Sequence, residues 1–172
     1  WTRNQNGKTK IYATLFNLTP VARQVVSLFS AIANAKEIEL INRIEGKFDI
    51  FADEDMIKTV LRNLISNAIK FTYTGGQVEL SLADSGDYWT IYVKDNGKGI
   101  PKDLQAHLLK SDEYITTYGT HNEKGSGLGL ILCRDFIRMN KGKLHFYSQE
   151  GIGTTFYFTI PKASSSAEAV SR

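Results

Sequence analysis

The stretch from Asp53 to Phe71 constrains the fold most, because it predicts a long helix with one strongly apolar face. Apolar residues recur there at helical spacing, at Met56, Ile57, Val60, Leu61, Leu64 and Ala68. A helix with such a stripe must bury it against another element. The chain has 172 residues, of which 42% are apolar and 23% charged, so we expect one domain with a hydrophobic core.

Strand and helix patterns alternate along the rest of the chain. A helix is predicted from Thr19, as the N-cap with Pro20 in the first helical position, and another over residues 127–140. Alternating segments at 38–44 and 47–52 predict two strands joined by a turn at Glu45–Gly46, and pairs at 77–84 with 88–95 and at 143–149 with 154–161 predict two hairpins. Three amphipathic helices and six or seven strands in mixed order predict an α/β fold: a two-layer sandwich of one mixed β-sheet covered on one face by three helices.

Bulk composition excludes several classes of protein. The net charge of +3 is small and scattered, so we expect no nucleic-acid partner. No apolar run is long enough to cross a bilayer, so we expect a cytoplasmic domain without membrane contact. The single cysteine, Cys133, excludes an internal disulfide and is expected in the core. Because the chain opens on Trp1, we expect a piece of a longer protein, with 1–10 as a linker and 162–172 as a polar tail.

Three polar residues share one face of the 53–71 helix. Asn63, Asn67 and Lys70 step by four and then three residues, which places them side by side. Two amide oxygens and a cation suit Mg²⁺ and a phosphate, since Mg²⁺ takes oxygen ligands and binds through few protein groups. A solvated polar face is the alternative interpretation.

Two glycine motifs follow. Asp95, Gly97 and Gly99 form D-x-G-x-G after a strand, where a carboxylate can accept a hydrogen bond from an exocyclic amine, although a plain turn explains the motif equally. Gly125, Gly127 and Gly129 lead into the last helix, whose N-terminus is an anion site unless the glycines are only a flexible lead-in. A dinucleotide fingerprint would need glycine at Leu130, and a P-loop around residues 7–9 would need glycine at Thr2.

The order of these motifs carries more information than any one of them. Residues 11–161 resemble the catalytic ATP-binding domain of a sensor histidine kinase, in the GHKL ATPase superfamily. "NLISNAIKFT" is similar to the N box of that family, "DNGKGIP" and "GSGLGL" to its glycine boxes, and "GIGTTFYFTIP" to its closing strand.

The resemblance implies ATP and Mg²⁺ as ligands. Asn67, with Asn63 one turn earlier, matches the metal-binding position. Lys70 matches a phosphate contact, and Asp95 the residue that pairs with the adenine amino group. The other implied ATP-binding residues are Phe71, Gly97, Gly99, Ile100, Lys124, Gly125, Gly127, Leu128, Gly129, Leu130 and Thr154.

The resemblance also implies a mobile ATP lid over about 102–124, with a departure from the family pattern. Leu108, Leu109 and Tyr114 stand where lid phenylalanines are usual, and the lid has no arginine, so Lys110 or Lys124 would supply its cation.

The substrate implied by the resemblance is a histidine followed by an acidic residue. His107, His121 and His145 all lack that context, so we expect His107 and His121 on the lid surface and His145 in a strand. The phosphoacceptor histidine is then expected on a dimerisation hairpin before Trp1, in a protein that forms a homodimer. A response regulator is expected as a further partner. Two alternatives stay open: another GHKL ATPase, including a serine-directed anti-sigma kinase, and a nucleotide sensor without catalysis.

Overall fold

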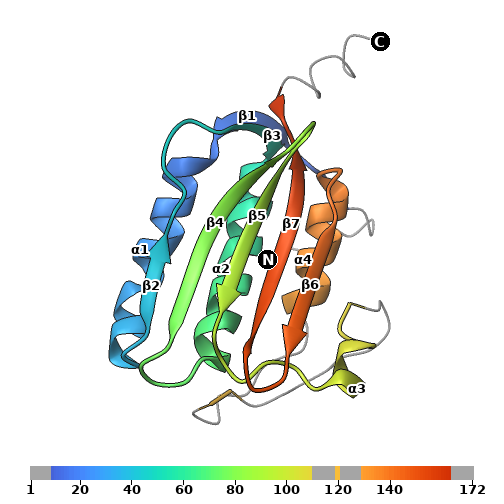
Figure 1. The fold of residues 1–172 in the computed structure, drawn as a ribbon. Helices are drawn as coiled ribbons and strands as arrows, with labels where there is room; N and C mark the ends of the chain where they lie inside the picture. The colour runs from blue at the N-terminus through green and yellow to red at the C-terminus, as the bar shows by residue number, and fades with distance from the viewer. Residues whose placement is uncertain (1–8, 110–118, 121–128, 164–172) are drawn as a thin grey trace.

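A five-stranded mixed sheet with helices packed on one face forms the body of the molecule (Figure 1). The computed structural model describes residues 9–109, 119–120 and 129–163. Its elements, in chain order, are β1 (Ala13–Asn17), α1 (Leu18–Ala35), β2 (Glu39–Asn42), β3 (Asp49–Asp53), α2 (Glu54–Phe71), β4 (Gln77–Ser85), β5 (Tyr88–Asp95), α3 (Lys102–Gln105), α4 (Gly129–Met139), β6 (Leu144–Gln149) and β7 (Gly153–Pro161).

The strand order of the main sheet is β2-β4-β5-β7-β6, and α1, α2 and α4 lie behind it in Figure 1. This arrangement confirms the predicted two-layer α/β sandwich, and both predicted hairpins are present as β4–β5 and β6–β7. The described residues contain one helix more than expected, the four-residue α3 at the start of the predicted lid. None of the helices among them is both long and apolar enough to cross a bilayer.

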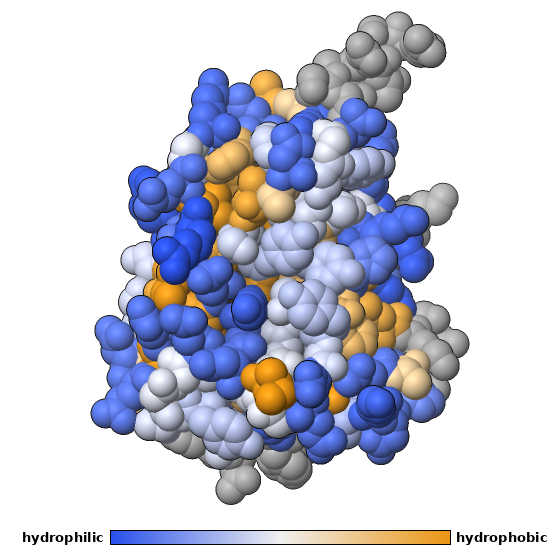
Figure 2. Space-filling model, in the orientation of Figure 1, coloured by the Kyte–Doolittle hydropathy of each residue, from blue (hydrophilic) through white to orange (hydrophobic). Residues whose placement is uncertain are grey.

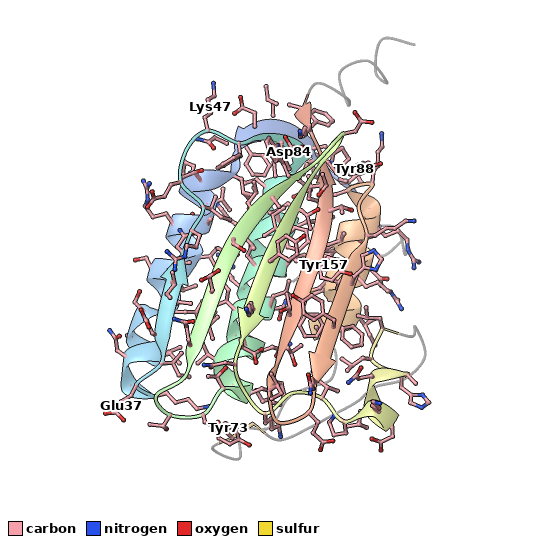
Figure 3. The ribbon with its side chains drawn as sticks, in the orientation of Figure 1. Glu37, Lys47, Tyr73, Asp84, Tyr88 and Tyr157 are labelled. Carbon is pink, nitrogen blue, oxygen red and sulfur yellow. The ribbon has the colours of Figure 1, made fainter. Side chains whose placement is uncertain are left out.

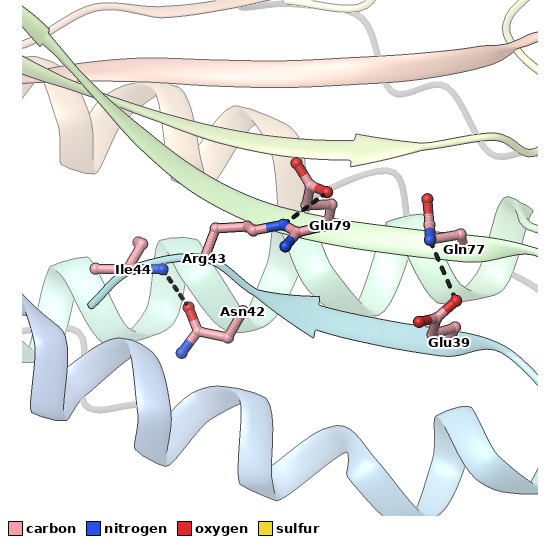
Figure 4. A network of polar contacts seen from close by, with 6 residues as sticks. All are labelled: Glu39, Asn42, Arg43, Ile44, Gln77 and Glu79. Atoms are coloured by element: carbon pink, nitrogen blue, oxygen red, sulfur yellow. Dashed lines mark hydrogen bonds and ion pairs between the residues drawn. The ribbon is translucent and has the colours of Figure 1, made fainter.

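Strands β2 and β3 follow one another in the chain but belong to different sheets. β2 pairs in parallel with β4, whereas β3 pairs with β1 in a separate two-stranded sheet. The β2–β4 pairing carries surface contacts from Gln77 Nε2 to Glu39 Oε2 at 3.2 Å and from Arg43 Nε to Glu79 Oε2 at 3.3 Å (Figure 4). Such exposed contacts are worth little, so the apolar side chains beneath them hold the strand.

Helix α2 packs at the centre of the helical layer, between α1 and α4 (Figure 1). It begins after Asp53, whose Oδ1 accepts a hydrogen bond from the amide of Met56 at 3.1 Å, and ends at Phe71, as the sequence predicts. The apolar stripe is fully buried, and it is wider than predicted because Ile65 and Ile69 are buried too.

The start of α1 differs from the prediction. Asn17 is the N-cap, because its Oδ1 accepts the amide of Thr19 at 3.2 Å and also the amide of Phe48 at 3.1 Å. Thr19 is already helical, and its hydroxyl donates instead to the carbonyl of Gly46 at 2.7 Å. We attribute the position of the N-cap to Asn17 because its side chain accepts a distant amide as well as a helical one.

The second face of the sheet carries no helix and faces the viewer in Figures 2 and 3. Figure 2 shows hydrophilic residues over most of this face, with smaller apolar areas between them. Tyr157, labelled in the middle of the sheet in Figure 3, stacks on Tyr92 with ring centroids 5.5 Å apart and on His145 at 5.3 Å. Cross-strand pairs of this kind stabilise a sheet face that water reaches.

The fold extends at least to Lys162, one residue past the predicted domain boundary at residue 161. Lys162 donates its amide to the carbonyl of Asp87 at 2.9 Å, and its Nζ lies 2.6 Å from Asp84 Oδ1. Residues 1–8 and 164–172, which make up most of the predicted linker and tail, lie outside the described residues.

Asn140 joins the end of α4 to the start of α2 and gives a test of this packing. It is 3% exposed, its Oδ1 accepts the amide of Asp53 at 2.7 Å, and its Nδ2 donates to the carbonyl of Phe136 at 2.7 Å. Asn140→Ala strands a buried N–H group, so we expect urea denaturation to show a loss of about 1–3 kcal/mol in the free energy of unfolding. Asn34→Ala, at an exposed site on α1, should change it by less than about 0.5 kcal/mol. An unchanged Asn140→Ala protein would contradict the role assigned to this side chain.

Candidate functional site

Four segments meet at one end of the sheet, the lower end in Figure 1: the last turns of α2, the loop after β5, the β6–β7 turn and α3. The loop is held on both sides, because the amide of Lys98 donates to the carbonyl of Phe71 at 3.0 Å and the amide of Gly151 donates to the carbonyl of Lys98 at 2.7 Å. Most of the sequence-predicted site residues within the described ranges lie in these segments.

The polar face of α2 lies where the sequence places it, with Asn63, Asn67 and Lys70 all half-buried. Asn63 donates Nδ2 to the carbonyl of Thr59 at 3.0 Å, and its side chain also contacts the Cys133 thiol of α4. The side-chain oxygen of Asn63 lies 3.1 Å from where a Cβ on Gly129 would be, so the first residue of α4 sits directly against Asn63. The positive N-terminal end of α4 therefore adjoins this polar face, and no acidic side chain in its first turn offsets that charge.

Two lysines flank the ring of Phe71. The Nζ atom of Lys70 lies 5.2 Å from the ring centroid and that of Lys98 lies 5.3 Å from it. Two ammonium groups therefore lie beside one half-buried aromatic ring at this end of the site.

Asp95 is the buried acid of the site, with 7% of its surface exposed. Burial raises the pKa of its carboxyl to about 6, even though hydrogen bonds from the amides of Gly97 and Thr154 favour the charged form. Those amides lie 2.9 Å and 3.3 Å from Asp95 Oδ1. Thr154 faces Asp95 across the β5–β7 pair, so these two predicted ATP-binding residues are neighbours.

Gly97 and Gly99 have a structural reason that the sequence did not show. A Cβ on Gly97 would lie 2.1 Å from the carbonyl oxygen of Phe71, and one on Gly99 would lie 2.1 Å from that of Gln149. Gly99 also has a φ of 66°, in the region that favours glycine. The loop is therefore wedged between α2 and the end of β6, and the protein itself requires both glycines.

Ser148 and Gln105 complete the site and were missed in the sequence. The Ser148 hydroxyl accepts the amide of Ile100 at 2.9 Å and lies 2.7 Å from the Thr154 hydroxyl. Gln105 Nε2 donates to the carbonyls of Ile100 at 2.7 Å and Ser148 at 3.2 Å. Ser148 was detectable as a polar residue in the inward phase of β6, after Leu144 and Phe146, whereas Gln105 carried no such signal.

Part of the predicted lid is described. Leu108 and Leu109 pack against the core, so they provide an anchor at the positions where the family often has phenylalanines. Arg134 of α4 adds a hydrogen bond from Nη1 to the carbonyl of Leu109 at 2.7 Å. The rest of the predicted lid, at 110–118 and 121–124, lies outside the described residues, so its predicted mobility stays a prediction. The same holds for the predicted roles of Lys110, Tyr114, His121, Lys124, Gly125, Gly127 and Leu128.

The predicted locations of the histidine and cysteine side chains agree with the structure for His145 and Cys133 but not for His107. His145 lies in β6, as expected, and is exposed, whereas His107 is half-buried rather than on the surface. Cys133 is fully buried as predicted, and burial raises the pKa of its thiol to about 12, which makes it a poor nucleophile. The described residues contain no cluster of three or more His, Cys, Asp or Glu side chains that could hold a metal.

Comparison with known protein families identifies the domain. Residues 52–164 match the family model described as "Histidine kinase-, DNA gyrase B-, and HSP90-like ATPase". The chain belongs to this ATPase family.

Its relatives include sensor kinases that are much longer. The chain is 30% identical over 161 residues to the adaptive-response sensory kinase SasA of Crocosphaera subtropica, covering 92% of this chain and 42% of SasA. It is 33% identical over 159 residues to the circadian input-output histidine kinase CikA of Synechococcus elongatus, covering 91% of this chain and 21% of CikA. The chain thus spans less than half the length of these relatives.

Solved structures of histidine kinases share the fold. A nucleotide-free catalytic domain of histidine kinase ThkA superposes with a TM-score of 0.75 at 31% identity, covering 88% of this chain and 98% of that one. Full-length ShkA in complex with AMPPNP gives a TM-score of 0.75 at 28% identity, covering 90% of this chain and 32% of that one.

The raised pKa of Asp95 predicts a pH-dependent cost to the nucleotide-free fold. The folded-state pKa lies above the usual 3.8, so the unfolded chain loses this proton first as the pH rises. The contribution of Asp95 to stability should fall between about pH 4 and pH 6, by up to about 3 kcal/mol, and then level off. In urea denaturation, Asp95→Asn should gain stability relative to the unmodified protein between pH 4 and pH 7. A difference between the two proteins that stays constant over that range would contradict the burial cost.

Proposed function

We propose that this chain is the catalytic ATP-binding domain of a two-component sensor histidine kinase, which transfers the γ-phosphoryl group of ATP to a histidine on a separate dimerisation domain. The observation that carries the proposal is the buried Asp95 carboxylate at the end of β5, followed by a loop that packs against the C-terminal end of α2. Family membership and the histidine kinase relatives support it.

Asp95 is suited to select adenine among the purine bases. Its carboxylate accepts two backbone amides and, as an ionised group, has further acceptor capacity for an exocyclic amino group. Adenine presents an amino donor at the position where guanine presents a carbonyl, which a buried carboxylate would repel. The Thr154 hydroxyl, held by Ser148, provides a second polar group beside it.

The polar face of α2 is suited to a Mg²⁺-triphosphate. The fit rests on the donor chemistry of the half-buried Asn63, whose oxygen lies beside the first residue of α4, and of Asn67 one turn along. These are two neutral oxygen ligands, which leave most Mg²⁺ positions to phosphates and water. When bound, Mg²⁺ would neutralise charge on the phosphates. Lys70 and the amides at the N-terminus of α4, starting with Gly129 and Leu130, would bind phosphate oxygens directly.

The described residues supply positioning and charge but no acceptor for the phosphoryl group. Phosphoryl transfer asks a protein mainly for these two services. We therefore assign the acceptor histidine to a hairpin of the same protein, preceding residues 1–10, with residues 11–161 as the catalytic domain and 162–172 as a tail. A homodimer, a cytoplasmic setting and a response regulator partner belong to the same proposal, and ThkA, a neighbour at 28% identity, is known in complex with the response regulator TrrA.

Nucleotide titration tests the site. By calorimetry, the chain should bind ATP with Mg²⁺ and discriminate against GTP. Asp95→Asn should weaken ATP binding about 10- to 100-fold, because it removes a charged acceptor. Asn67→Ala should lose the Mg²⁺-dependent part of the affinity, and Asn34→Ala, on the exposed face of α1, should bind normally. Unchanged binding by both site variants would refute the assignment.

Phosphoryl transfer tests the reaction. Incubated with labelled ATP and Mg²⁺, the chain alone should remain unlabelled, because no histidine in it has the acceptor context. Adding the N-terminal hairpin of the parent protein as a separate polypeptide should give acid-labile, alkali-stable label on the hairpin, slowly, since separation lowers the effective concentration. Asn67→Ala should abolish it.

Each other outcome of that transfer experiment has a meaning. Stable label on His107, His121 or His145 of the chain alone would contradict the substrate assignment. Acid-stable serine phosphate would indicate a serine-directed kinase. Tight ATP binding without transfer to any histidine would indicate a nucleotide sensor.

A further inference from the structure

The C-terminal end of α2 is held by donors from several segments of the chain. A helix leaves its last four carbonyls without helical partners. Here each of the four has a partner. The Ala68 carbonyl accepts a hydrogen bond from Thr72 Oγ1 at 2.6 Å, and the Phe71 carbonyl accepts one from the amide of Lys98 at 3.0 Å. Lys36 Nζ donates to the carbonyls of Ile69 at 3.0 Å and Lys70 at 2.9 Å, and the Lys70 carbonyl also accepts the amide of Thr120 at 3.0 Å.

Lys36 is unusual among these donors because it is a buried charge. It follows the last residue of α1, its side chain crosses to α2, and only 7% of its surface is exposed. Burying an ammonium group is costly unless it is well paired. The two carbonyls and the negative end of the α2 macrodipole supply that pairing, so its charge is fixed at one place behind the candidate phosphate site.

Thr120 belongs to the segment that the sequence predicts as the lid. Its amide shares the Lys70 carbonyl with Lys36 Nζ, and its hydroxyl donates to the carbonyl of Thr72 at 2.8 Å. The last turn of α2, which carries Lys70 and Phe71, is thus joined on one carbonyl to the end of α1 and to this segment.

We propose that Lys36 and Thr120 are positioning residues for the triphosphate, holding the last turn of α2 in the geometry that Asn67 and Lys70 need. This inference rests on the proposed ATP site. Two effects act together: the hydrogen bonds fix the turn, and the Lys36 charge offsets the negative helix end, which would otherwise repel the phosphates.

Comparing two ligands separates positioning from general stability. Adenosine uses only the base and ribose part of the site, whereas Mg²⁺-ATP also uses the α2 turn. We expect Lys36→Met to weaken Mg²⁺-ATP binding about tenfold in calorimetry while changing adenosine binding, measured by NMR titration, by less than about twofold. Lys36→Arg should retain most of the Mg²⁺-ATP affinity, because it keeps the charge and its donors.

The matched control is Lys162→Met. Lys162 pairs with Asp84, which Figure 3 labels at the opposite end of the sheet from Tyr73, two residues after α2. This variant should bind both ligands normally. Equal losses of adenosine and Mg²⁺-ATP binding in Lys36→Met, or no loss at all, would overturn the proposal.

A variant of Thr120 tests the proposal independently, and it can be used even if Lys36→Met fails to fold. Thr120→Val removes the hydroxyl bond and keeps the amide, so we expect about a threefold loss of Mg²⁺-ATP affinity and unchanged adenosine binding. Thr19→Val, which removes a hydroxyl bond to Gly46 near the start of α1, is its control and should bind normally. No selective loss in Thr120→Val would overturn the Thr120 role.

Coupling between the two residues completes the test. The Thr120 hydroxyl, which Thr120→Val removes, also lies 3.4 Å from the Lys70 carbonyl that Lys36 Nζ binds. The double variant should therefore lose less affinity than the product of the single losses. Independent effects would show that they do not act through one turn. Asp95→Asn is included in the same titrations. If Asp95→Asn loses ATP binding while the Lys36 and Thr120 variants do not, only this inference fails. If the unmodified chain binds no ATP, the proposed function fails as well.

Discussion

The backbone groups at the two ends of α2, which have no partner within the helix itself, determine how the rest of the molecule is attached. At the N-terminal end, Asp53 accepts the amide of Met56 with one oxygen and the amide of Tyr12, just before β1, with the other at 2.8 Å. Its own amide donates to Asn140 at the end of α4. At the C-terminal end the partners come from α1, the loop after β5 and Thr120. Since buried backbone groups must be paired, these bonds hold the helical layer and the site in one arrangement.

The site is built where backbones approach each other too closely for side chains. Gly97 lies against the end of α2, and Gly99 lies against the end of β6. Gly153, with a φ of 148°, has its Cα so near the carbonyl of Asp95 that a Cβ would lie 2.1 Å from that oxygen. In the same crowded place Asp95 is 7% exposed, and the amides of Gly97 and Thr154 donate to its carboxylate. Close packing and the polarity of the site therefore have one origin.

Local patterns in the sequence predicted much of this correctly, and distant contacts account for what they missed. Helix α2 and both hairpins follow from short-range periodicity and turn residues, and the fold class followed from their order. The N-cap of α1 was wrong because Asn17 also binds Phe48, 31 residues away. In the site, Asn63, Asn67 and Asp95 stand out by residue type and spacing. Lys36 and Thr120 do not, since each acts on a carbonyl of another segment, and no local pattern records such a contact.

Asp95 shows how a cost in the free fold can serve binding. Both amide donors bond the same oxygen of the Asp95 carboxylate, and burial of the group raises its pKa despite them. An adenine amino group would supply a further donor in a place that water reaches poorly, so part of the desolvation cost is already met before the base arrives. A neutral amide at the same position would fit the packing and stabilise the free protein, but it would accept that hydrogen bond less strongly. The local instability at residue 95 is thus what we expect of a group kept for recognition rather than for folding.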